Sequence, residues 1–194
     1  MKDFVRSAGR LRALPFPARL TYSIFLAFTL LALGLTGWLG ADMLGINLRG
    51  IDEYYAGAAD EAAPPPEASV ADGSAGPRLE LPNEVLAPIK RDPIPLRKLL
   101  EVTHFHLFSL PVYLMILSHL FMLSSLGTRA KSLWIGLGAL GVALHIAAPW
   151  LAREGGLTAR LFYAGSGALL TAAFLVMCAV PLLEMWRPRG RAAS

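Results

Sequence analysis

Four stretches of the chain are long and apolar enough to cross a lipid bilayer. A spanning helix needs about 20 predominantly apolar residues, and none of the four carries Asp, Glu, Lys or Arg in its middle. They cover residues 21–41, 103–126, 133–151 and 161–185. This pattern predicts an all-α integral membrane protein with four transmembrane helices in an antiparallel bundle.

The composition supports this interpretation. Apolar residues make up 55% of the 194 residues and charged residues only 16%, whereas soluble domains have about 45–50% and about 25%. An ordinary cytosolic domain and a disordered chain are therefore excluded. The single Cys excludes a disulfide framework and any Cys-based zinc or iron–sulfur site. The net charge is +4, but the basic residues form no stripe, so we expect no nucleic-acid partner.

Basic residues gather in three of the segments outside the spans. These segments are the tail 1–20, the turn between the second and third spans, and the tail 186–194. Because cytoplasmic segments carry an excess of Lys and Arg, we expect both termini to lie in the cytoplasm. The opposite side of the membrane is then the acidic one.

Residues 42–102 form one long outer loop in this arrangement. Residues 58–77 are rich in Ala and Pro, which predicts a partly flexible linker. The end of the loop contains four prolines, which favour extended backbone and predict that the second helix begins after the last of them: Pro82, Pro88, Pro93 and Pro95. Tyr54 and Tyr55 are candidates for the headgroup region of the membrane.

All four histidines lie in the second and third predicted spans: His104, His106, His119 and His145. Ionisable residues inside a membrane are costly and mark functional sites. A single His in a span often serves only as a hydrogen-bonding contact between helices. Four in two consecutive spans favour a cofactor site.

Helix geometry separates these histidines. At 100° per residue, His104 and His106 point about 160° apart, so they cannot bind one metal while both are helical. His145 is the only His on another span, and short turns make the second and third spans antiparallel neighbours. Counting 1.5 Å per residue from the span ends, His145 lies about 5–12 Å from the depth of His106 and about 8–15 Å from that of His119.

One b-type haem is the cofactor that this arrangement predicts. Its axial ligands would be His145 and either His106 or His104, and His119 is a further candidate ligand. Two bis-His haems are excluded, because three histidines lie on one span and one on the other.

Glu101 adds two alternatives. It lies three residues before His104, a spacing that metal-binding helical bundles use, so Glu101, His104 and His106 are candidates for a copper or zinc site at the outer surface. Glu101 is equally a candidate proton acceptor for a quinol. The simplest alternative is a solvated carboxylate near the start of a helix, where the helix dipole favours it.

The motif T-H-x-H-x-F-S, at Thr103–Ser109, follows an external Y-Y-x-G at Tyr54–Gly57. With the four-span topology, it resembles a group of small bacterial membrane proteins associated with gene neighbourhoods of c-type cytochromes. The resemblance implies the bacterial inner membrane, with the loop 42–102 on the periplasmic side, and nearby electron-transfer proteins. It makes His104 and His106 the best candidates for a shared role.

These observations predict a membrane subunit that binds a b-type haem and relays electrons between the quinone pool and an outer-face partner. The first alternative is a non-enzymatic anchor or assembly subunit of a larger respiratory or photosynthetic complex. The second is the outer-face copper or zinc site. Hydrolysis by a zinc protease is not supported, because the motif H-E-x-x-H is absent from the sequence.

Overall fold

The computed structural model describes residues 10–45, 48–57 and 92–187. Its described part is helical and contains no strand. The predicted linker 58–77, together with Pro82 and Pro88, lies outside the described residues, as do the outermost parts of the two basic tails.

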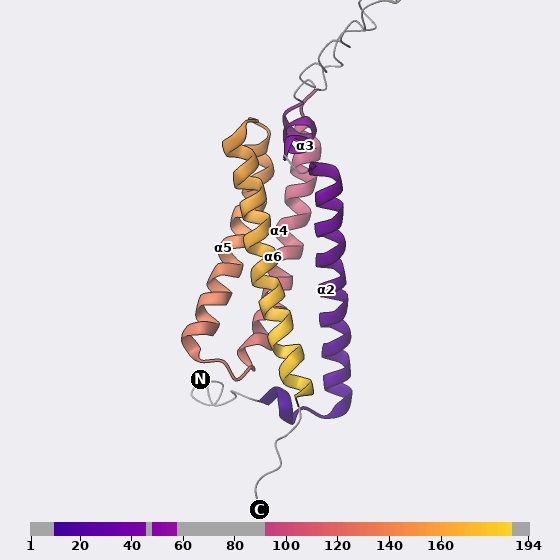
Figure 1. Cartoon of the computed structure of the whole chain (residues 1–194), viewed down its shortest axis with the longest axis vertical. Helices are drawn as coiled ribbons and strands as arrows, with labels where there is room; N and C mark the ends of the chain where they lie inside the picture. Colours follow the sequence, from indigo (N-terminus) through magenta and orange to yellow (C-terminus); the bar gives the residue numbers. More distant parts are fainter. Residues whose placement is uncertain (1–9, 46–47, 58–91, 188–194) are drawn as a thin grey trace, which may run out of the picture.

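Four long helices make up the bundle: α2 (Phe16–Leu44), α4 (Leu96–Met122), α5 (Thr128–Ala152) and α6 (Leu157–Trp186). Each is long and apolar enough to cross a membrane, which confirms the predicted all-α class. Helices that follow one another in the chain run antiparallel, and a short 3₁₀ helix, η1 (Arg10–Ala13), lies at the same end of the bundle as the turn between α4 and α5 (Figure 1).

Prolines mark two of the helix starts. α4 begins directly after Pro95, as predicted, and α2 begins directly after Pro15, earlier than the predicted span 21–41. Proline is compatible with a helix start because the first backbone N–H groups have no partner within the helix. Three of the helices extend beyond their apolar runs at both ends, whereas α4 ends at Met122, so that 123–126 form a turn.

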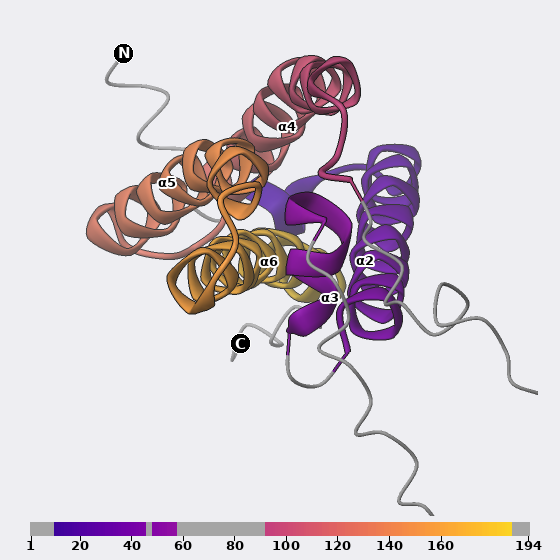
Figure 2. The ribbon, with the colours of Figure 1, turned by 90° about the horizontal axis from the view of Figure 1, so that it is seen from above.

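The helix α6 is the centre of the bundle, since it packs against α5, α4 and α2 (Figure 2). α5 and α6 approach closely at Gly141, where a Cβ atom would lie only 3.0 Å from Cα of Leu170. Small residues allow such close packing in lipid, where van der Waals contact drives helix association. Large apolar side chains such as Phe28 and Trp38 on α2 point outward, as expected for contact with the lipid bilayer.

A buried polar cluster fixes the turn between α4 and α5 against α6. The carboxylate of Glu184, which is 6% exposed, accepts hydrogen bonds from the backbone N–H (2.8 Å) and the hydroxyl (2.6 Å) of Ser125. The ammonium of Lys131 donates to the carbonyl oxygens of Met122 and Ser124. These contacts satisfy the free carbonyls at the end of α4 and hold α4 and α5 in one register.

Candidate functional site

His106 on α4 and His145 on α5 face each other. Their ring centroids lie 5.7 Å apart, with the ring planes at 73°. The two residues lie at nearly equal distances from the turn that joins the helices. At the other end of the α4–α5 interface, the indole Nε1 of Trp150 donates a hydrogen bond to the hydroxyl of Thr103 (2.9 Å). The structure therefore assembles one of the two predicted histidine pairs.

The hydrogen bonds of this pair leave ring nitrogens available. Nδ1 of His106 lies 2.7 Å from the carbonyl oxygen of Val102. Because a carbonyl only accepts, Nδ1 is the donor, and Nε2 of the neutral ring keeps its lone pair. Nδ1 of His145 is buried and has no hydrogen-bond partner among the described residues. It faces Gly167 of α6, where a Cβ atom would lie 3.9 Å away.

His104 lies on the other side of α4. It is exposed, and its ring packs on Phe108 at 4.9 Å between centroids. α4 is continuous through both motif histidines, so the expectation from helix geometry that His104 and His106 point apart is confirmed. His104 is not brought to the pair.

His119 lies nearer the turn end of α4. It is exposed, and its Nδ1 is 3.2 Å from the carbonyl oxygen of Met115. This is a bond within one turn of the same helix. The structure thus leaves His119 apart from His106 and His145.

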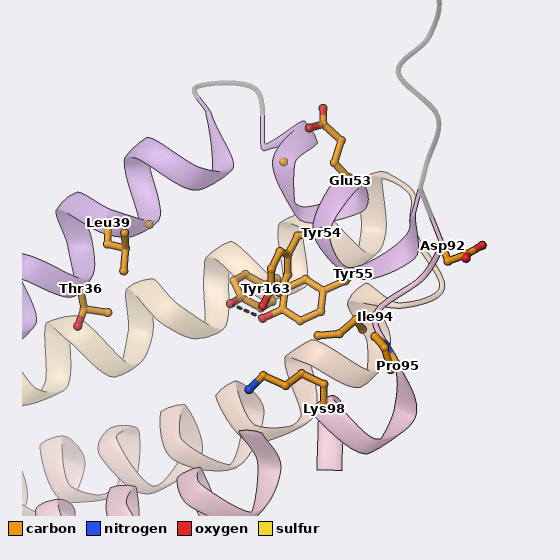
Figure 3. Close-up of a pocket in the computed structure, with 12 residues that line it drawn as sticks. Thr36, Leu39, Glu53, Tyr54, Tyr55, Asp92, Ile94, Pro95, Lys98 and Tyr163 are labelled. Carbon is orange, nitrogen blue, oxygen red and sulfur yellow. Dashed lines mark hydrogen bonds between the residues drawn. The ribbon is translucent and has the colours of Figure 1, made fainter. Parts of the chain in front are cut away.

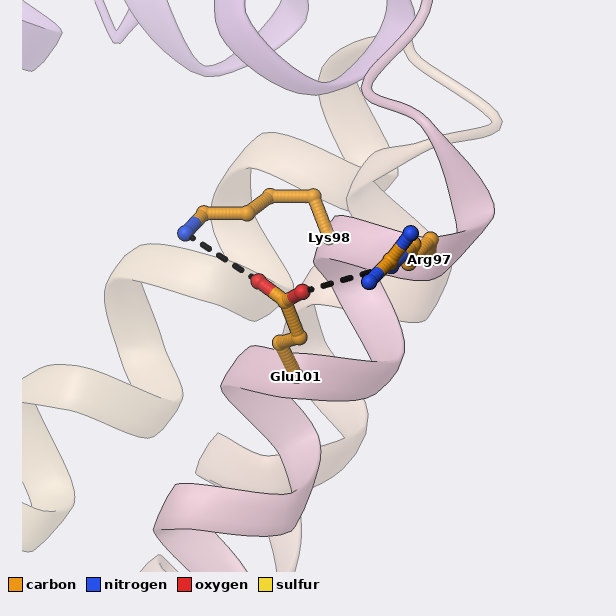
Figure 4. A network of polar contacts seen from close by, with 3 residues as sticks. All are labelled: Arg97, Lys98 and Glu101. Carbon is orange, nitrogen blue, oxygen red and sulfur yellow. Dashed lines mark hydrogen bonds and ion pairs between the residues drawn. The ribbon is translucent and has the colours of Figure 1, made fainter.

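Glu101 lies in an exposed cluster near the start of α4. Its carboxylate contacts Nε of Arg97 at 3.7 Å and Nζ of Lys98 at 3.4 Å (Figure 4). Glu101 and His104 share a shallow surface pocket that does not include His106. The described residues contain no group of three His, Cys, Asp or Glu side chains that could hold a metal ion, so the three residues of the copper or zinc alternative are not assembled.

A row of tyrosines leads from the histidine pair to the segment that follows α2. The ring of Tyr163 on α6 lies 6.1 Å from that of His145. The hydroxyl of Tyr163 lies 3.0 Å from that of Tyr55, whose ring contacts Tyr54 edge to face at 4.9 Å. Sequence reasoning placed Tyr54 and Tyr55 near the membrane surface but missed Tyr163, because no local pattern reports a contact across more than a hundred residues.

Tyr55 belongs to a short helical segment that we call the cap, made of α3 (Arg49–Ile51) and the π-helix η2 (Asp52–Ala56). The cap covers the end of the bundle opposite the α4–α5 turn (Figures 1 and 2). Its buried Asp52 accepts hydrogen bonds from Nε of Arg160 (2.7 Å) and from the backbone N–H of Gly156 (3.2 Å).

Two further features hold the cap close to the bundle. The backbone N–H of Ile94 donates to the carbonyl of Tyr55. Gly155 adopts a positive φ of 72°, and a Cβ there would lie 3.2 Å from that of Ala56.

Burial of Tyr55, reinforced by the neighbouring Tyr163, raises the pKa of its hydroxyl well above the ordinary value. Tyr55 therefore stays neutral and hydrogen-bonded at physiological pH.

A cavity of about 730 Å³ lies beside the cap, between α2 and the start of α4 (Figure 3). Side chains from four elements line it. They include Thr36 and Leu39 of α2, Glu53, Tyr54 and Tyr55 of the cap, Lys98 of α4 and Tyr163 of α6. The cavity thus has one wall from a membrane span and a polar, aromatic wall at the cap end of the bundle.

Comparison with known proteins identifies a family for this chain. A family model described as a transmembrane helical domain matches residues 45–192, which contain the cap, α4, α5 and α6. No curated protein and no solved structure matches the chain. The chain belongs to the family Aq_1264_TM, a family of transmembrane helical domains, and is an integral membrane protein with four spans.

Proposed function

We propose that the protein is a membrane subunit that holds one b-type haem between His106 and His145 and relays electrons between the quinone pool and a protein at the outer face. The observation that supports this proposal is the 5.7 Å contact of the two rings across the α4–α5 interface. Two imidazoles on facing helices are a common axial ligand set for haem iron in helical bundles.

The chemistry of the pair fits an iron centre. An axial imidazole must be neutral and offer one lone pair, while its other nitrogen is held by an outer hydrogen bond. His106 meets this requirement, because Val102 fixes its Nδ1 and leaves Nε2 free. Metal–imidazole bonds are about 2.0–2.1 Å long, and the 5.7 Å between the ring centroids is close to the spacing that two imidazoles on one metal would need.

His145 fits for a second reason. Its buried Nδ1 has no partner among the described residues, and a buried polar nitrogen without a partner costs about 1–3 kcal/mol. A metal bound at this nitrogen would remove the cost. When bound, haem supplies one-electron oxidation and reduction, while the helices hold its ligands and exclude water from them.

The distribution of charge supports an orientation. The end of the bundle that carries η1 and the α4–α5 turn also carries Arg12, Arg19, Arg129 and Lys131. By the positive-inside rule this end lies in the cytoplasm, and the cap lies outside. In the bacterial inner membrane the cap then faces the periplasm, and the resemblance of the T-H-x-H-x-F-S motif supports a c-type cytochrome as the outer partner.

The competing function is a haem-free anchor or assembly subunit of a larger complex. In that case the histidines serve only helix packing, and the outer loop docks the partner. Replacement of His106 and His145 by Ala would then leave co-purification of the partner intact, whereas deletion of the loop would abolish it.

An absorption spectrum tests the haem proposal. The protein is purified in mild detergent from cells supplied with a haem precursor, and a second sample is reconstituted with haemin. We expect a Soret band that shifts on reduction with dithionite and an α-band typical of b-type haem in both samples. Absence of these bands from both samples would contradict the proposal.

A further inference from the structure

We infer that the cavity between α2, the cap and α4 binds the ring of a quinol. This inference rests on the proposed function for its role in electron relay, but it concerns a separate site. The binding itself needs only the cavity and its side chains, so it can be measured with and without haem.

The position of the cavity indicates a lipid-soluble ligand. Thr36, Leu39 and Gly40 form its wall on α2, near the outer end of that helix. α2 is the least enclosed of the four spans, with 11% of its most apolar window buried. A ligand with an apolar tail in the bilayer can therefore place its polar ring in the cavity from the side.

The polar wall offers hydrogen-bond donors and an aromatic surface. Tyr55 and Tyr163 share one hydrogen bond between their hydroxyls, which leaves further hydrogen-bonding capacity on both oxygens. Lys98 extends along the cavity below them, and Tyr54 lies beside them (Figure 3). A flat ring that carries hydroxyl or carbonyl oxygens matches this combination of donors, acceptors and ring faces.

The charge of the lining argues against a phospholipid headgroup. Glu53 and Asp92 carry negative charge, and Lys98 is the one basic residue among the lining residues that the structure describes. Lys98 is also shared with Glu101, which contacts its ammonium at 3.4 Å. A phosphate would meet net repulsion here, whereas an uncharged ring would not.

The cavity is connected to the histidine pair through one side chain. Tyr163 lines the cavity, and its ring lies 6.1 Å from that of His145, which in turn contacts His106. A ring bound against Tyr163 is therefore separated from the proposed ligands by a single residue. Glu101 lies behind Lys98 and does not line the cavity, so the tyrosine pair, and not Glu101, is the group that touches the quinol.

Binding of a short-chain quinone tests this inference. The protein is placed in nanodiscs of zwitterionic lipid, and decylubiquinone and a short-chain menaquinone are titrated by calorimetry. Leu39→Trp fills the cavity from α2, and Leu35→Trp is the matched control. Leu35 lies one turn away with a similar exposure (56% against 59%) but does not line the cavity. Tyr163→Phe removes one hydroxyl and keeps the ring.

We expect the wild type and Leu35→Trp to bind at least one quinone with equal affinity. Leu39→Trp should bind it at least about tenfold more weakly. Tyr163→Phe should bind it about tenfold more weakly, because it loses one hydrogen bond to the ligand. If Leu39→Trp does not fold, as judged by circular dichroism, Tyr163→Phe decides. Unchanged binding in the folded cavity variants, or no quinone binding in the wild type, would overturn the inference. So would binding of phosphatidylglycerol in place of quinone.

A haem-free variant separates this inference from the proposed function. His106→Ala lacks one proposed axial ligand but changes no residue of the cavity lining. Quinone binding that persists in this variant supports the cavity site whether or not the wild type shows haem bands. Quinone binding lost in Leu39→Trp with intact haem bands supports both proposals.

Discussion

The rings of His106 and His145 lie 5.7 Å apart, although the residues come from two different helices. Two sets of contacts at opposite ends of the interface hold this relationship: Glu184 with Ser125 at the turn, and Trp150 with Thr103 near the cap. The pair is therefore positioned by the bundle itself.

If the pair holds haem as proposed, replacement of one member by Met should retain the haem and raise its reduction potential. A thioether is a weaker electron donor than an imidazole, and His/Met ligation raises the potential of haem iron relative to other axial sets. We expect this result for His145→Met in a potentiometric titration. The control is His119→Met, on the exposed side of α4, which should leave the potential unchanged; a shift of equal size in the control would contradict the assignment.

Two glycines of α5 should respond to alanine with opposite signs. At Gly141 a Cβ would lie 3.0 Å from the backbone of Leu170, so Gly141→Ala should destabilise the bundle by about 1–3 kcal/mol through overpacking. At Gly136 nothing lies within 4 Å, so Gly136→Ala should stabilise the helix by about 0.5–1 kcal/mol. Unfolding in mixed detergent micelles measures both values, and equal effects would refute the close approach of α5 and α6.

Replacement of Glu184 should lower the free energy of unfolding of the bundle. Glu184→Ala leaves the backbone N–H of Ser125 without its acceptor, at a cost of about 1–3 kcal/mol. Glu154→Ala is the matched control, because Glu154 is exposed in the turn between α5 and α6. Its free energy of unfolding should match that of the wild type. A stable Glu184→Ala variant would show that the α4–α5 turn does not need the carboxylate.

Alkaline pH should loosen the cap. The folded state raises the pKa of Tyr55, so it holds a proton that the unfolded chain releases near pH 10. The stabilisation is thus complete below about pH 10 and is lost as the pH rises further. Tyr55→Phe has no such proton, so the stability of the wild type relative to this variant should fall above about pH 10. Parallel curves for the two proteins across this range would contradict the buried hydroxyl pair.

The four spans and the start of α4 were predictable because hydropathy and proline act locally along the chain. The divergence of His104 and His106 was predictable for the same reason, since helix geometry alone separates them. The positions of the helix ends were harder to predict, because polar residues such as Arg97 and Lys98 extend α4 beyond its apolar run.

The depth of His145 relative to His106 depended on those ends. Counting from the predicted spans left a difference in depth of several ångströms between His106 and His145, whereas their rings are in contact. The turn 123–127 and its bonds to Glu184 set the register of the two helices. The contacts of Asp52 with Arg160 and of Tyr55 with Tyr163 join distant segments. No periodicity within either segment reports them.

The reduced-minus-oxidised absorption spectrum of four single variants tests the central claim most directly. His106→Ala and His145→Ala each remove one proposed ligand, while His104→Ala and His119→Ala change histidines that point away from the pair. We predict that the first two variants lose the b-type α-band or shift it strongly, and that the last two keep the wild-type spectrum. Wild-type spectra from His106→Ala and His145→Ala, or loss of the band only in His104→Ala or His119→Ala, would contradict the claim.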